Sequence, residues 1–155
     1  MKKEHFKVKS LKISSGNLKE AVYQDENYIS HKVTPPKNKI IHNDLKDSIS
    51  NLHEYFHNCL NSSINSEDLE VKGFSIKEKE DDVVIINFTG VMFCRDAKPI
   101  GVSTPGYDIE ELVDINKKTE AHITDIIDNI NSEVYEFLFG VKQGGQQEMD
   151  INEDE

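Results

Sequence analysis

The sequence predicts an α+β fold, in which a mostly antiparallel sheet of about five or six strands packs against two helices. Two observations lead to this class. β-Branched and aromatic residues form short runs between turn residues in two blocks, at residues 6–33 and 69–103. Each block is followed by a segment whose apolar residues recur at helical spacing. The expected order along the chain is therefore strands, helix, strands and helix.

The first block is expected to contain three short strands, at residues 6–13, 19–23 and 28–33, with polar turns between them. Pro35 and Pro36 then end the block, because proline has no N–H to donate to a neighbouring strand.

The first helix is expected to begin near Asn43, a good N-cap residue, with Asp44 and Asp47 close to the positive end of the helix dipole. Its apolar residues recur at helical spacing and should face the core: Leu45, Ile49, Leu52, Phe56 and Leu60.

The second block begins with a strand at residues 69–77 and continues with residues 83–93, the most apolar segment of the chain. That segment is expected to form the central strand, and residues 99–103 should return beside it after a hairpin turn.

The last helix is expected to end at Gly140, a residue suited to the position after a helix C-terminus. Two starting points fit the pattern, one near residue 109 and one near residue 117. One apolar stripe defines it: Ile123, Ile126, Ile127, Ile130, Val134, Phe137 and Leu138.

Residues 1–140 are thus expected to form a single domain, followed by an acidic tail at residues 141–155. The last ten residues carry five acids and no base, so the tail is expected to be disordered. Because the order of strands and helix resembles that of OB folds, closure of the sheet into an OB-like barrel is the alternative architecture.

The net charge of −11 is unevenly distributed. Residues 1–40 carry nine lysines and four acids, whereas residues 41–145 carry nine bases and twenty acids. A strongly negative protein is a poor general ligand for nucleic acid, although the basic N-terminal segment could contact DNA locally.

No run of apolar residues is long enough to span a membrane, and the N-terminus lacks the apolar stretch of a signal peptide. Cys59 and Cys94 lie far apart in apolar surroundings, which is typical of buried thiols in a reducing cytosol. We therefore expect a cytoplasmic protein.

The sharpest motif is His53-Glu54-Tyr55-Phe56-His57, which resembles the H-E-x-x-H signature of zincin metallopeptidases. This spacing places His53 and His57 one helical turn apart as zinc ligands, with Glu54 as the general base for metal-bound water. A third ligand would be needed, and no second motif supplies one. A half-exposed structural pair of histidines is the competing interpretation, and no other catalytic arrangement indicates an enzyme.

Residues 146–151 resemble the Gln-x-x-Leu-x-Leu-Phe peptides that bacterial replication proteins insert into the sliding clamp. The resemblance implies that Gln146 is the lead glutamine and that Met149 and Ile151 enter an apolar pocket. Asn152 stands where those peptides have an aromatic residue, so the largest anchor is missing. The tail is either such a docking peptide or a solubilising end.

Single-stranded DNA binding is a further hypothesis, supported by aromatic residues among the N-terminal lysines that could stack on bases. Acidic tails of single-stranded-DNA-binding proteins resemble this one, and they recruit partner proteins. The residues expected to contact DNA are Phe6, Lys7, Lys9, Lys12, Tyr23 and Tyr28.

In layout the chain is similar to a loose group of small proteins encoded by bacteriophages and prophages. The resemblance covers a proline-led helix at residues 35–60, the end of a strand pair at residues 102–105, a last helix ending at residues 133–140, and a glutamine-bearing acidic tail. It implies a phage setting within a bacterial host.

The leading hypothesis is therefore a non-enzymatic, phage-type accessory protein of DNA metabolism that contacts replication or recombination proteins. The alternatives are a single-stranded-DNA-binding protein, a zinc peptidase, and an inhibitor of a host protein whose acidic surface mimics DNA.

Overall fold

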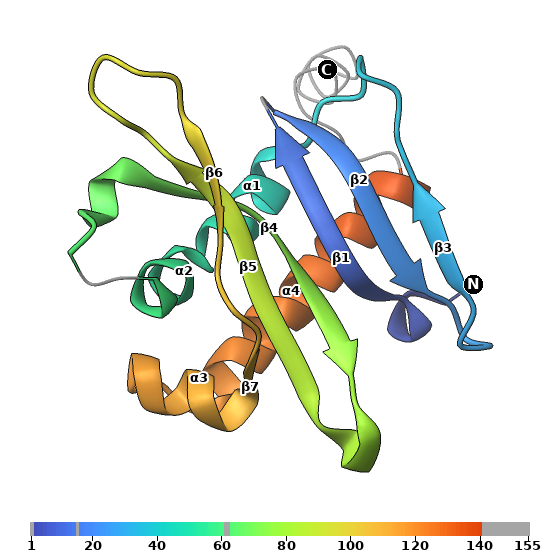
Figure 1. Ribbon diagram of the computed structural model, residues 1–155. Coiled ribbons are helices and arrows are strands. Elements are labelled where there is room, and N and C mark those ends of the chain that lie inside the picture. The colour runs from blue at the N-terminus through green and yellow to red at the C-terminus, as the bar shows by residue number, and fades with distance from the viewer. Residues whose placement is uncertain (1, 15, 61–62, 141–155) are drawn as a thin grey trace, which may run out of the picture.

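The computed structural model describes residues 2–14, 16–60 and 63–140. Its strands form one antiparallel sheet in the order β3-β2-β1-β4-β5-β6, and β7 pairs with the other end of β5 (Figure 1). The predicted α+β class and antiparallel pairing are confirmed. The strands are β1 (Lys7–Ser14), β2 (Asn17–Gln24), β3 (Ser30–Val33), β4 (Leu69–Glu78), β5 (Val84–Met92), β6 (Ile100–Ser103) and β7 (Tyr107–Asp108).

The α-helices contact the sheet on one side, and Figure 1 shows α4 crossing behind the strands beside α1 and α2. The core lies between these layers, and its largest fully buried side chains are Tyr55, Phe56, Phe74, Phe88 and Phe137. The helices are α1 (Asn43–Ser50), α2 (His53–Cys59), α3 (Ile109–Asn116) and α4 (Glu120–Phe139), and short 3-10 turns occupy Lys3–His5 (η1), Ser66–Asp68 (η2) and Glu80–Asp82 (η3).

The first predicted helix is two helices in the structure, α1 and α2. Leu52 donates its N–H to the carbonyl of Ile49, a tighter bond than the α-helical one, and the helix axis breaks there. The predicted apolar stripe survives the break, because Leu45, Ile49, Leu52 and Phe56 are all fully buried.

The final helical segment is also divided, which explains why two starting points fitted its sequence. Lys117 adopts a left-handed conformation with φ of 55° and ends α3. Thr119 then caps α4 by accepting a hydrogen bond from the N–H of His122.

The sheet does not close into a barrel. Strands β3 and β6 lie at opposite ends of the strand order and do not pair, so the OB-like alternative is wrong. Among the described residues, no helix combines the length and the apolar character that crossing a bilayer requires.

Candidate functional site

Strand register determines which side chains lie on the sheet face that the helices leave uncovered. Leu11 pairs with Ala21 of β2 and Phe74 of β4, and all three side chains are buried beneath the helices. Because successive residues of a strand point to opposite faces, Ser10 and Lys12 lie on the uncovered face.

The same alternation places four lysines on the uncovered face, and we call them the lysine face. Polar and uncharged side chains, including Ser75 and Asn87, occupy positions between them. The lysine face consists of Lys7, Lys12, Lys32 and Lys77, which pair across the strands with Gln24, Glu20, Val22 and Ile85 respectively.

Charge is segregated between the two layers of the protein. Strands β1, β2 and β3 together hold five lysines and one glutamate, and the other four strands hold two lysines and three acidic side chains. The four α-helices hold eleven acidic side chains and one lysine, Lys46. The net charge of −11 therefore does not describe the sheet surface.

Some of the sheet lysines are paired with carboxylates. Lys9 lies at a bulge in β1, and its Nζ is 2.6 Å from Oε1 of Glu78. The hydrogen bond from Lys9 lowers the pKa of the Glu78 carboxyl. Lys32 Nζ is 3.6 Å from Oε2 of Glu20, an exposed and weak contact.

The other three members of the lysine face have no such pairing. Within the described part of the chain, no carboxylate oxygen lies within 4.0 Å of the Nζ atoms of Lys7, Lys12 or Lys77. Their side chains are exposed. These three cations are therefore available to an anionic ligand.

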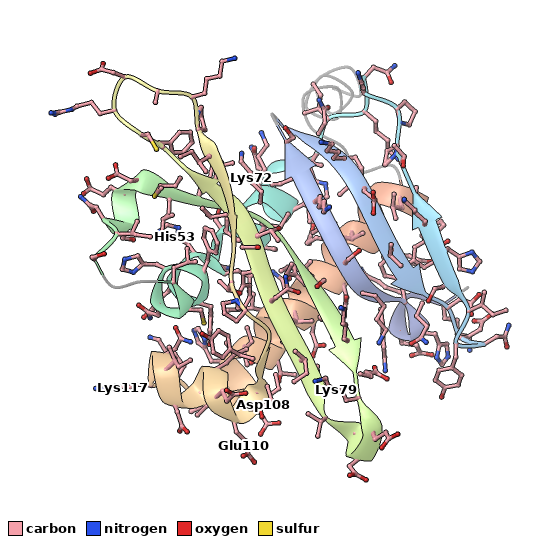
Figure 2. All side chains as sticks on the ribbon, in the orientation of Figure 1. His53, Lys72, Lys79, Asp108, Glu110 and Lys117 are labelled. Atoms are coloured by element: carbon pink, nitrogen blue, oxygen red, sulfur yellow. The ribbon has the colours of Figure 1, made fainter. Side chains whose placement is uncertain are left out.

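A cleft lies where β1 and β4 separate, and no member of the lysine face lines it. The two strands pair only through Ser10–Lys12 and Gly73–Ser75, and Figure 1 shows them diverging beyond this contact. The cleft has a volume of about 660 Å³ and α1 forms part of its wall. Its lining residues are Ile13, Gly16, Ile41, Lys46, Ile49, Ser50, His53, Glu70, Val71 and Lys72, of which His53 and Lys72 are labelled in Figure 2.

The predicted zinc motif lies on α2, and its side chains are held by other parts of the protein. His53 Nε2 is 2.7 Å from Ser66 Oγ, and His57 Nε2 donates to the carbonyl of Ile64 at 2.8 Å. Glu54 lies 3.7 Å from Lys118 Nζ. No third ligand joins the two histidines among the described residues, so the structure does not assemble the zincin site there.

Two of the aromatic residues predicted to stack on DNA lie in the core instead. Phe6 and Tyr23 are only 2% and 8% exposed, and their ring centroids are 4.7 Å apart. Their apolar surfaces pack against Tyr135 and Phe139 of α4, which removes them from a role in base stacking. Tyr28, in the turn before β3, is 80% exposed.

Sequence reasoning missed a cluster of His42, Asp44 and Glu133 at the contact between α1 and α4. His42 Nε2 lies 2.6 Å from Oε2 of Glu133, although 91 residues separate them in the chain. His42 occupies the N-cap position of α1, which the sequence suggested for Asn43, but its side chain makes no capping hydrogen bond. No sequence signal links these residues, because only the packing of the two helices brings them together.

The predicted docking residues Gln146, Met149 and Ile151 lie outside the described residues. The chain matches no protein-family model, no curated protein and no solved structure.

Proposed function

We propose that the protein is a non-enzymatic accessory protein that binds the phosphate backbone of nucleic acid through its lysine face. The observation that carries this proposal is the segregation of charge, with lysines on β1, β2 and β3 and carboxylates on the helices.

The side chains on the lysine face suit contact with the phosphate backbone of a nucleic acid, without recognition of its bases. Lysine neutralises phosphate and releases condensed counterions, which supplies most of the sequence-independent affinity of DNA-binding proteins. The Ser75 hydroxyl donates to Oδ1 of Asn87, so the amide NH₂ of Asn87 is the group of this pair that can add hydrogen bonds to phosphate oxygens. Because Phe6 and Tyr23 are buried, base stacking is not part of the proposal.

The acidic helices do not prevent such binding. The outer side of a helix lies about 10–12 Å beyond its inner side. Charges at that separation are largely screened, since the Debye length is about 8 Å at physiological ionic strength. A ligand on the uncovered face therefore responds mainly to the nearby lysines.

Two matched double variants test the proposal. Lys7→Ala/Lys12→Ala removes two cations from the lysine face, and Lys117→Ala/Lys118→Ala removes two from the region of α3, away from β1–β3 (Figure 2). Fluorescence anisotropy at low salt would measure binding to a labelled single-stranded oligonucleotide and to its duplex. We expect the first variant to bind roughly tenfold or more weakly and the second to bind like the wild type. Absence of binding by the wild type, or equal losses in both variants, would refute the proposal.

The proposed accessory role also includes a protein partner from replication or recombination. Its basis is the sequence of the tail, where Gln146, Met149 and Ile151 resemble a clamp-docking peptide. Pull-down with full-length and shortened chains tests this part: capture that is equal without residues 146–155 would exclude it.

A further inference from the structure

Strand β3 forms a free edge of the sheet. It lies at one end of the strand order, and among the described residues its only strand partner is β2. Alternate residues of an edge strand direct their N–H and C=O groups outward, and within the described part of the chain no backbone hydrogen bond reaches the outer side of Ser30–Val33. An extended peptide can add to such an edge as a further strand.

The two faces at this edge differ in character. Lys32 belongs to the lysine face, whereas His31 pairs with the buried Tyr23 on the helix side. Two apolar side chains nearby are half exposed: Ile29, which directly precedes β3, and Phe139, whose ring centroid lies 5.6 Å from that of Tyr23. A strand that fits this edge therefore has acidic side chains on one face and apolar side chains on the other.

A segment of the acidic tail has this two-sided pattern. Glu148 and Asp150 alternate with Met149 and Ile151. Because successive residues of a strand point to opposite faces, an extended conformation separates the two acids from the two apolar side chains.

Charge favours the edge at β3 over the edge at β6. Residues 27–43, which include β3, contain three lysines and no acid, whereas residues 146–155 contain five acids and no base. Strand β6, at the other end of the strand order, contains no charged residue. The tail therefore matches β3 in charge and does not match β6.

The same chain can supply the added strand. Helix α4 ends at Phe139, which contacts Tyr23 of β2. Residues 141–147 connect this point to the acidic segment, and seven residues can extend over about 23 Å. Neighbouring strands lie about 4.8 Å apart, so a strand beyond β3 is only about 10 Å from β2.

We propose that residues 148–151 add to the outer edge of β3 in the same chain, as a further strand of the sheet. Backbone hydrogen bonds to β3 hold the segment, its acids lie beside Lys32, and its apolar side chains lie on the side of Phe139. The docked tail competes at Lys32 with any other anion, and the contact does not depend on the nucleic-acid binding proposed above.

Amide hydrogen exchange, followed by NMR on full-length chains, tests this contact. We expect the outward-facing amides of β3 to exchange about tenfold more slowly in the wild type than in Met149→Ser/Ile151→Ser, which removes both apolar side chains. Gln146→Ser/Gln147→Ser is the matched control, because these residues precede the proposed strand, and it should exchange like the wild type. Exchange in β6 should be the same in all three chains.

The dependence on protein concentration identifies whose tail occupies the edge. Protection by the tail of the same chain does not change with concentration, because the tether fixes the effective concentration of the segment. Equal exchange of β3 in the wild type and in Met149→Ser/Ile151→Ser would overturn the proposal, as would equal losses of protection in both double variants. Protection that rises with protein concentration would overturn it too, since it indicates the tail of a second copy.

Discussion

At the scale of single residues, Gly73 permits the close contact that joins the two halves of the sheet. A Cβ atom at this position would lie 1.9 Å from the carbonyl oxygen of Leu11, so a larger residue must push β1 and β4 apart.

We predict that Gly73→Ala lowers the free energy of unfolding by about 1–3 kcal/mol, the usual effect of overpacking. Gly101→Ala is the control, because nothing lies within 4 Å of a Cβ there, and its effect should be within about 0.5 kcal/mol. Urea denaturation of the two variants measures both values. If both variants lost the same free energy of unfolding, the contact between β1 and β4 would not restrict the size of the residue at position 73.

Two buried groups make the protein sensitive to alkaline pH. Burial raises the pKa of the Cys59 thiol from 9.0 to about 11 and that of the Tyr55 hydroxyl from 10.0 to about 12. Above pH 9 the unfolded chain releases the thiol proton while the folded chain keeps it, so rising pH favours unfolding.

We therefore predict that the free energy of unfolding falls as pH rises from about 9 to about 11. In Cys59→Ala the fall should be shallower, since only the Tyr55 contribution remains in this range. Denaturant titrations at several pH values measure the two slopes. If the free energy of unfolding fell with pH equally steeply in the wild type and in Cys59→Ala, the Cys59 thiol would not be a cause of the fall.

At the scale of elements, α3 shows how local sequence signals define a helix end. The Asp108 carboxylate accepts a hydrogen bond from the N–H of Glu111 at 2.8 Å, and the Glu111 side chain accepts one from the N–H of Asp108. This reciprocal capping box fixes the start of α3 at the end of β7.

We predict that Asp108→Ala destabilises the protein by about 1 kcal/mol, as loss of an N-cap usually does. Asp114→Ala, at an exposed position within α3, should change stability by no more than about 0.5 kcal/mol. Thermal unfolding followed by circular dichroism compares the two variants. A loss in Asp114→Ala as large as that in Asp108→Ala would contradict the capping role.

Periodicity predicted the buried stripes of the helices but not where the helices divide. The break at Leu52 leaves the apolar spacing almost unchanged, so the sequence pattern continues through it. Lys117 ends α3 in a left-handed conformation, which favours glycine or asparagine rather than lysine, and no residue preference indicated it.

At the scale of the whole molecule, the sequence indicated a basic N-terminal segment but not the face on which its lysines lie. Bulges at Lys9 and near Gly73 change the alternation of the strands, so register could not be counted from the sequence. The helices cover the opposite face, and this arrangement follows from tertiary packing alone. The cluster of His42, Asp44 and Glu133 was hidden for the same reason.

The acidic tail should oppose nucleic-acid binding through its charge. We predict that a chain ending at residue 145, which lacks five carboxylates of the tail, binds an oligonucleotide more tightly at low salt. The difference should shrink as salt is added, and thermal stability should stay nearly unchanged. Equal affinities at low salt would show that the tail charge does not reach the binding surface.

The salt dependence of oligonucleotide binding tests the central claim most directly. On single strands, each phosphate neutralised contributes about 0.7 to the slope of log affinity against log salt concentration. If Lys7 and Lys12 each neutralise one phosphate, Lys7→Ala/Lys12→Ala should lower the wild-type slope by about 1.4. The Lys117→Ala/Lys118→Ala variant should keep the wild-type slope. An unchanged slope in the first variant would contradict phosphate binding by the lysine face.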